Sequence, residues 1–179
     1  MIRTLWDKEY ASGKWDHCDS TPGDPVYGFV EKYCRNGSIL DLGCGAGNTG
    51  NELAVNRYKE YTGVDLSEVA VRKAAQRSER EGRSKKNRYV QSDILSYVPK
   101  QKHDVILFRE SLYQIRPDKI NAALDRYFPY LPEGGVFIAV ISRNGTKRVR
   151  EVVGLIGAKR RVIEKHSEAS RESHIVVFR

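Results

Sequence analysis

A short apolar stretch runs directly into a glycine-rich turn at residues 39–50, where the sequence reads ILDLGCGAGNTG. The residues before the turn suit a strand that is buried on both faces. Glycines then follow at positions 43, 45, 47 and 50, and glycine lets a backbone turn tightly and approach a ligand closely. Open α/β sheets bind ligands at the carboxyl ends of their strands. This stretch therefore predicts both an α/β fold and a ligand site at the turn.

Strand and helix patterns alternate along the rest of the chain, which predicts a mostly parallel sheet covered on both faces. The expected strands are 38–42, 61–64, 88–91, 104–108 and 136–141. The expected helices have apolar faces at Val26 to Tyr33, 48–56, Ser67 to Arg80 with Ser67 as N-cap, Asp118 to Phe128 with Asp118 as cap, and Val149 to Ile156. Residues 160–166 and 173–179 are predicted to form a hairpin that adds one antiparallel strand. The predicted fold is three-layered and doubly wound, with about seven strands.

Composition narrows the class of protein. The 179 residues are 40% hydrophobic, which is enough for one domain with a real core. No apolar run approaches the roughly 20 residues of a membrane span, and MIRTLWDKEY has no secretory apolar centre. Three cysteines, at 18, 34 and 44, suggest neither a disulfide framework nor a metal site. We expect a cytoplasmic protein, monomeric or homodimeric, with no metal and no membrane partner.

The formal net charge is +8, and it is unevenly placed. Residues 72–88 hold eight basic and two acidic side chains. A second cluster consists of Arg143, Lys147, Arg148, Arg150, Lys159, Arg160 and Arg161. Such clusters can bind nucleic acid. No RNA-binding aromatic pattern or zinc finger accompanies them, so a solvated helix face and loop is the preferred interpretation.

Asp41 helps to decide which ligand the glycine turn holds. Read from Gly45, the turn matches G-x-G-x-x-G with Asp65 twenty residues on, so a nicotinamide dinucleotide is possible. A pyrophosphate at this turn would be repelled by the carboxylate of Asp41, which directly precedes the glycines. An ammonium or sulfonium group would be attracted instead. S-adenosylmethionine carries both groups.

Residues 39–47 resemble the first motif of the class I S-adenosylmethionine-dependent methyltransferases, and the similarity extends over about residues 36–141. Asp65, in TGVDLS, stands where that family places an acid that accepts hydrogen bonds from the ribose hydroxyls. Asp93, in QSDIL, resembles the acid that meets the adenine amino group, with Ile94 beside the base. LPEGGVF (131–137) is similar to the family's turn before its fifth strand. The alternative for each aspartate alone is a surface turn former.

The strand that ends in VILFRES lies where the family's fourth motif sits. Methyltransferases that act on exocyclic amines of DNA carry N/D-P-P-Y/F there, and this chain has no proline pair. ESLYQI instead resembles the E-x-L-Y-x-hydrophobic stretch of small-molecule methyltransferases, including the N-methylating, nodulation-type branch. An amine acceptor must be unprotonated to attack, so a nearby carboxylate or phenol can take its proton, and we expect Glu110 to hold and deprotonate the acceptor and Tyr113 to orient it. The alternative is that Glu110 pairs with Arg109 or Arg116 and only caps the sheet.

The segment LWDKEYASGKWDHC (5–18) resembles the family's W…Y…G-x-W-D segment, which folds over the cofactor. Aromatic faces suit a sulfonium. Trp6, Tyr10 and Trp15 could equally be core residues of a first helix, and His17 could be a base or a solvated loop residue. The expected cofactor-binding residues are Tyr10, Trp15, Asp41, Gly43, Gly45, Asp65, Leu66, Asp93, Ile94 and Arg109. Arg109 could instead bind an anionic part of the substrate.

These observations predict one Rossmann-like methyltransferase domain over residues 1–179. It would have a lid at 1–24, a cofactor-binding core at 36–141 and a terminal hairpin at 158–179. The expected activity is transfer of a methyl group from S-adenosylmethionine to nitrogen or oxygen of a small molecule, with S-adenosylhomocysteine as product. The alternatives are an RNA or protein methyltransferase that uses the basic clusters, or a non-catalytic cofactor-binding module.

Overall fold

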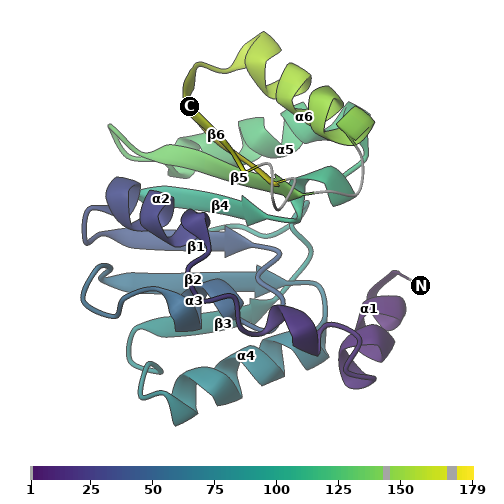
Figure 1. The fold of residues 1–179 in the computed structure, drawn as a ribbon, viewed down its shortest axis with the longest axis vertical. Helices are drawn as coiled ribbons and strands as arrows, with labels where there is room; N and C mark the ends of the chain where they lie inside the picture. Colours follow the sequence, from purple (N-terminus) through teal and green to yellow (C-terminus); the bar gives the residue numbers. More distant parts are fainter. Residues whose placement is uncertain (1, 143–145, 169–172) are drawn as a thin grey trace.

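The computed structural model of the chain describes residues 2–142, 146–168 and 173–179, which form helices around a central sheet (Figure 1). The seven-stranded sheet has the order β3-β2-β1-β4-β5-β7-β6. All neighbours pair in parallel except β7, which is antiparallel to both β5 and β6. The strands are β1 (Ser38–Leu42), β2 (Glu60–Asp65), β3 (Asn87–Gln91), β4 (Val105–Arg109), β5 (Val136–Ser142), β6 (Val162–Glu168) and β7 (Ser173–Phe178). The predicted fold and its hairpin are confirmed.

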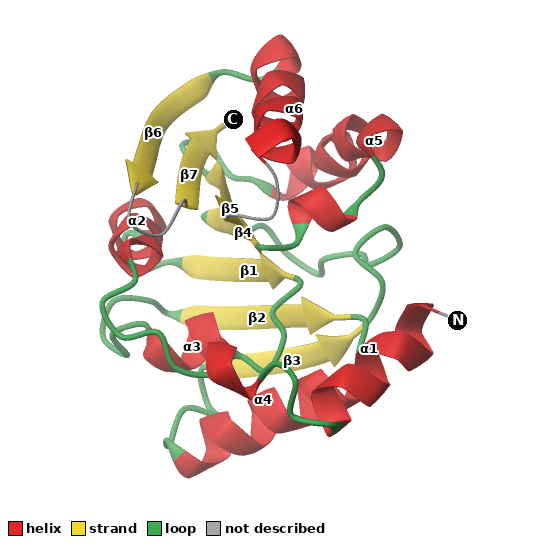
Figure 2. Cartoon of the chain, turned by 45° about the vertical axis from the view of Figure 1, so that its right-hand side comes forward, coloured by secondary structure: helices red, strands yellow, loops and turns green. Residues whose placement is uncertain are grey.

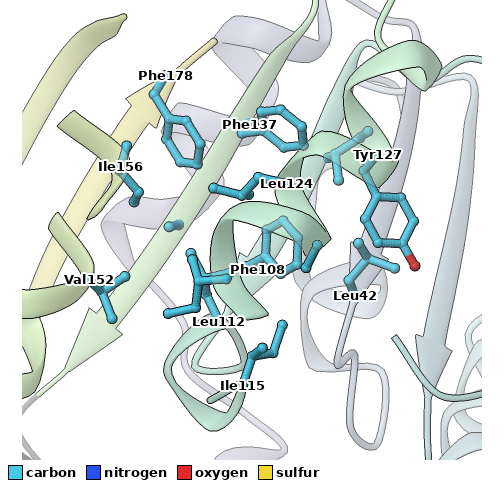
Figure 3. Close-up of a cluster of buried hydrophobic side chains, with 14 of the residues drawn as sticks. Leu42, Phe108, Leu112, Ile115, Leu124, Tyr127, Phe137, Val152, Ile156 and Phe178 are labelled. Atoms are coloured by element: carbon cyan, nitrogen blue, oxygen red, sulfur yellow. The ribbon is translucent and has the colours of Figure 1, made fainter. Parts of the chain in front are cut away.

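Buried strands alternate their side chains between two apolar layers, as Val105 to Phe108 show. Ile106 and Phe108 point into one cluster with α5 (Pro117–Tyr127) and α6 (Thr146–Lys159), part of which Figure 3 shows. Val105 and Leu107 point into the other cluster, which contains the buried side of α2 (Pro25–Cys34). Because both faces are covered, the strands read as continuous apolar runs rather than as alternating ones.

Helix boundaries follow local capping chemistry. Ser67 caps α4 (Glu68–Arg80) as predicted, and its hydroxyl accepts a hydrogen bond from the Ala70 amide. The prediction that Asp118 caps α5 is wrong. The helix begins at Pro117, whose fixed φ suits the first helical position, and the carboxylate of Asp118 pairs with Arg116.

The helix predicted at 48–56 is shorter in the structure. α3 (Asn48–Glu52) stops because Leu53 takes extended torsions, with φ −55° and ψ 145°. The next amide, that of Ala54, donates to the side chain of Glu31 on α2. A bond to another helix thus replaces the continuation of this one.

The first helix, α1 (Ile2–Ala11), lies beyond the carboxyl ends of β2 and β3 (Figure 2). None of its residues is buried, so the alternative that its aromatic residues belong to the core is wrong. Asp7 holds the helix against α4 by accepting a hydrogen bond from the Ser67 hydroxyl at 2.7 Å. None of the described helices is long and apolar enough to cross a membrane.

Candidate functional site

The glycine turn after β1 is tightly enclosed. Gly43 and Gly45 have φ angles of 89° and 53°, which favour glycine. A Cβ atom on Gly43 would lie 2.4 Å from the Cβ of Ser111, and one on Gly45 would lie 2.7 Å from the Tyr10 hydroxyl. A side chain at Gly43 would overlap Ser111, whereas one at Gly45 would require the Tyr10 hydroxyl to move. The turn therefore offers bare backbone to whatever lies between it and the surrounding elements.

Asp65, at the end of β2, braces the glycine turn. One carboxylate oxygen accepts the Gly45 amide at 2.9 Å, and the other accepts the Ser67 amide at 2.8 Å. Burial raises the pKa of Asp65, and hydrogen bonds from the backbone of Ser67 and Gly45 oppose that rise. Because a carboxylate oxygen has two lone pairs, each oxygen can still accept from a ligand hydroxyl.

Asp41, on β1, is only 1% exposed. Its Oδ2 accepts a hydrogen bond from the Tyr61 hydroxyl at 2.6 Å, whereas Oδ1 is buried without a partner in hydrogen-bond geometry. Burial raises the pKa of Asp41 to about 6, opposed by the Tyr61 hydroxyl, the charge of Arg109 and the nearby Thr49 hydroxyl. Leaving a buried acceptor unsatisfied is unfavourable. An ammonium group arriving beside the turn would supply the missing donor, so the site fits a cationic ligand.

Ile94 and Leu66 flank the same edge of the sheet, and Asp93 lies farther out. The Ile94 Cδ1 atom is 3.8 Å from the position of a Cβ on Gly43. The Leu66 carbonyl accepts a hydrogen bond from the Gln91 side chain at 3.1 Å. Asp93 is exposed, and its Oδ1 accepts the Leu95 amide at 2.8 Å. Asp93 thus forms a turn after β3 and also leaves its carboxylate exposed there.

Arg109, the last residue of β4, is directed to the N-terminal segment. Its guanidinium pairs with Asp24 at 2.7 Å and donates to Thr21 Oγ1 at 2.9 Å. The charge lies 5.3 Å from the ring centre of Tyr27, and Nη1 is 3.4 Å from the Thr49 hydroxyl. Arg109 therefore ties the loop before α2 to the carboxyl edge of the sheet.

Glu110 follows Arg109 with a φ of 58°, which is rare for a residue other than glycine. Its Oε2 accepts the Tyr113 hydroxyl at 2.9 Å and the Ser142 amide at 3.2 Å. Arg109 pairs with Asp24 and Arg116 with Asp118, so the capping pairs considered as alternatives are not formed. Burial and the nearby Glu110 charge raise the pKa of Tyr113. The two expected catalytic residues are in direct contact, and backbone strain of this kind concentrates at functional sites.

Three N-terminal aromatic residues form one cluster near the glycine turn. The ring centres of Trp6 and Trp15 are 5.8 Å apart, and those of Tyr10 and Trp15 are 6.5 Å apart. Tyr10 reaches Gly45 through its hydroxyl, while Trp15 donates to Glu9 at 3.0 Å. His17 is exposed, and its Nδ1 is 3.0 Å from the Lys14 carbonyl oxygen.

Sequence reasoning missed several residues of this site. The Ser111 hydroxyl donates to the Leu42 carbonyl and places Ser111 against the turn. Tyr61 carries the hydrogen bond to Asp41. Asp24 pairs with Arg109 and also caps α2 through the Val26 amide. Only Asp24 had a readable signal, because Asp followed by Pro marks a helix start.

Comparison with protein families finds that residues 39–135 match a methyltransferase domain family. Trans-aconitate 2-methyltransferase from Rhodopseudomonas palustris is 31% identical over 110 residues, covering 60% of this chain and 40% of that protein. Sterol 24-C-methyltransferase erg6 from Aspergillus fumigatus is 26% identical over 141 residues, covering 72% of this chain and 37% of that protein. The chain thus spans less than half the length of these curated relatives.

Solved structures share the fold over a larger share of their length. N-methyltransferase NodS from Bradyrhizobium japonicum, in complex with S-adenosyl-L-homocysteine, has a TM-score of 0.77 and 21% identity. That match covers 99% of this chain and 97% of the other. The [4+2]-cyclase SpnF has a TM-score of 0.72 and 16% identity, covering 86% of this chain and 80% of the other. The fold therefore serves more than one reaction class, and the site must decide the function.

Proposed function

Because the chain belongs to the class I S-adenosylmethionine-dependent methyltransferases, we propose that it transfers a methyl group to nitrogen or oxygen of a small molecule. One observation carries the choice of cofactor. The buried carboxylate of Asp41 precedes the glycine turn, the partly buried carboxylate of Asp65 accepts from its Gly45 amide, and Asp41 Oδ1 has no partner in hydrogen-bond geometry. That arrangement suits a cationic nucleoside better than a pyrophosphate. The names of two curated relatives also specify small acceptors, trans-aconitate and a sterol.

The residues around the turn can hold each part of the cofactor. Asp41 would meet the ammonium group of the methionine part, against the bare backbone of Gly43 and Gly45. Asp65 would accept from the ribose hydroxyls, with Leu66 beside it. Asp93 and Ile94 would meet the adenine ring, and Tyr10, Trp15 and Arg109 would cover the cofactor from the N-terminal side.

When bound, S-adenosylmethionine supplies a methyl carbon to which the acceptor lone pair bonds, while the electrons of the broken C–S bond stay on sulfur and neutralise it. An amine acceptor must be unprotonated to react, and Glu110 would accept its proton. Tyr113 holds the Glu110 carboxylate through their 2.9 Å hydrogen bond and so fixes its direction. Alignment of this kind contributes up to roughly 7–11 kcal/mol to catalysis in well-oriented systems.

The basic stretch 72–88 supports a small acceptor over RNA. Arg77 pairs with Glu52 at 2.7 Å and with Glu81 at 2.9 Å. Arg83 and Lys86 donate to backbone carbonyls, at 2.7 Å to Leu53 and 2.7 Å to Val55. Several of these cations therefore stabilise the fold through contacts within the chain rather than being available to bind phosphates. In the second cluster Arg160 pairs with Asp125, and Arg143 lies outside the described residues.

Isothermal titration calorimetry with S-adenosylhomocysteine tests the proposal, with NADH as the competing ligand. We expect S-adenosylhomocysteine to bind one site and NADH not to bind. Binding of NADH alone would contradict the assignment. Release of S-adenosylhomocysteine by the isolated chain, in the presence of an acceptor, would separate an enzyme from a non-catalytic cofactor-binding module.

A further inference from the structure

A cavity of about 210 Å³ lies at the carboxyl ends of β4 and β5, between the start of α2 and the terminal hairpin. Its polar lining consists of Asp24, Arg109, Glu110, Ser142, His166 and Ser173. Val140 and Ile175 supply apolar wall. Glu110 and Arg109 thus connect this cavity to the candidate site, whereas His166 and Ser173 come from β6 and β7.

The described residues that line the cavity carry charges that do not cancel. Arg109 is neutralised by Asp24, since the two side chains form an ion pair at 2.7 Å. Within residues 2–142, 146–168 and 173–179, Glu110 accepts from two neutral donors, the Tyr113 hydroxyl and the Ser142 amide, and forms no ion pair. Among the described lining residues, the charge left without a counter-charge is therefore the negative one of Glu110. Such a wall attracts an ammonium group and repels a carboxylate.

The hairpin supplies groups that can hydrogen-bond to a ligand. His166 packs its ring 5.6 Å from the ring centre of Phe29 on α2, which orients the imidazole. A histidine can donate or accept, and the serine hydroxyls can do both. The cavity is smaller than the roughly 300–1,000 Å³ typical of pockets for drug-sized ligands. It therefore suits a small polar molecule or the small polar end of a longer one.

We infer that this cavity binds the methyl acceptor, and that the acceptor is a small amine held between Glu110 and the terminal hairpin through His166 and Ser173. The inference rests on the proposed function and makes it more specific. The amine reaches Glu110 as an ammonium ion, leaves its proton on that carboxylate and presents its lone pair. His166 and Ser173 are binding residues that set which amine fits.

The same geometry argues against the acceptors that the curated relatives' names specify. A tricarboxylate such as trans-aconitate would place negative charge against Glu110, with Arg109 already paired. A sterol would cover the polar groups of the cavity, most of them already partly buried, without offering them hydrogen-bond partners, which is unfavourable. The acceptor of this chain therefore differs in charge from trans-aconitate and in polarity from a sterol.

The test uses isotope-labelled protein saturated with S-adenosylhomocysteine and followed by NMR. Ethanolamine, benzylamine and trans-aconitate are titrated separately. We expect at least one amine to shift the signals of Glu110, Ser142 and His166, and trans-aconitate to leave them unchanged. His166→Gln removes the imidazole that hydrogen-bonds to the amine, and Ser173→Phe fills part of the cavity. Each should therefore weaken amine binding about ten-fold.

His174→Gln is the matched control. His174 is on the same hairpin and lies 2.9 Å from the Ser167 hydroxyl, but it does not line the cavity. It should leave amine binding within about two-fold of wild type. Equal effects of the two histidine variants, tighter binding of trans-aconitate, or no shift with either amine would each overturn the inference. Calorimetry on the same samples distinguishes failure of this inference from failure of the proposed function. If S-adenosylhomocysteine binds and the amines do not, only this inference fails.

Discussion

The guanidinium of Arg109 lies 2.7 Å from the carboxylate of Asp24, a residue 85 positions earlier in the chain. The same guanidinium donates to Thr21, in the loop before α2. Both side chains of the pair are largely buried, with 13% and 19% exposure. The N-terminal segment is therefore held at the carboxyl edge of the sheet by an ion pair that water screens only weakly.

Asp24→Asn should lower the free energy of unfolding by about 1–3 kcal/mol, because it leaves the largely buried Arg109 without its counter-charge. Asparagine can still cap α2, so the effect reports the charge. Urea unfolding followed by fluorescence measures it. Arg116→Gln is the control, since Arg116 is 80% exposed and its loss should change stability by less than about 0.5 kcal/mol. Equal effects of the two substitutions would contradict the prediction.

Glu110→Gln should slow methyl transfer to an amine about 100-fold or more while leaving S-adenosylhomocysteine affinity within about two-fold. The amide can still accept the Tyr113 hydroxyl but cannot take a proton from the acceptor. Single-turnover kinetics and calorimetry measure the two quantities. Glu133→Gln, in the exposed turn before β5, is the control and should change neither. Normal turnover by Glu110→Gln would show that another group receives the proton.

Comparing Gly43→Ala with Gly82→Ala separates the cost of backbone strain from the cost of overlap with neighbouring atoms. Both positions have positive φ, 89° and 68°, but an added Cβ meets Ser111 at 2.4 Å in the first and nothing within 4 Å in the second. Gly82→Ala should cost about 1 kcal/mol of stability from strain alone. Gly43→Ala should cost about 1–3 kcal/mol more from overpacking and weaken S-adenosylhomocysteine binding at least about ten-fold. Denaturation and calorimetry decide, and similar losses in both variants would refute the enclosure of the turn.

Asp41 should make stability depend on pH. Burial raises its pKa in the fold from 3.8 to about 6, so its contribution is fully present below about pH 3.8 and is lost as pH rises through about 6. Asp41→Asn stays neutral at every pH. The free energy of unfolding of the variant minus that of wild type should therefore increase by about 3 kcal/mol between pH 3.5 and pH 7. Urea unfolding across that range measures the difference, and a flat difference would mean that Asp41 titrates normally.

The affinity for S-adenosylhomocysteine should rise over the same pH range in which the stability contribution of Asp41 is lost. An ammonium group binds the ionised form of Asp41, so S-adenosylhomocysteine affinity should rise as pH increases from 5 to 7. Adenosine lacks the ammonium group and serves as the control, with no such rise expected. If both ligands respond alike, the ammonium does not meet Asp41.

The central sheet could be predicted because burial on both faces makes each strand an apolar run ended by polar turn residues. Val105 to Phe108 and Val136 to Ile141 are of this kind, and both are strands in the structure. Ser67 was readable as a cap because its bond to Ala70 is local. The prediction that Asp118 caps α5 was wrong because Pro117 starts that helix, with Arg116 as the residue before it.

The candidate site was only partly readable, because several of its contacts join distant segments. Asp41, Gly43 and Gly45 stand in one continuous stretch, and Asp65 follows the next strand. Nothing local to VILFRES indicates that Arg109 meets Asp24 while Glu110 meets Ser142. The sequence around His166 carries no sign of this role, since its place in the same cavity lining as Glu110 depends on how the hairpin joins the sheet.

The position of β7 between β5 and β6 has a consequence for synthesis on the ribosome. β6 is translated before β7, yet it pairs with β7. Until β7 emerges, β5 presents an uncovered row of amides and carbonyls, and unpaired edges of this kind are where nascent chains associate with one another. Completion of the central sheet, and with it the amine cavity, must therefore wait for the second strand of the hairpin.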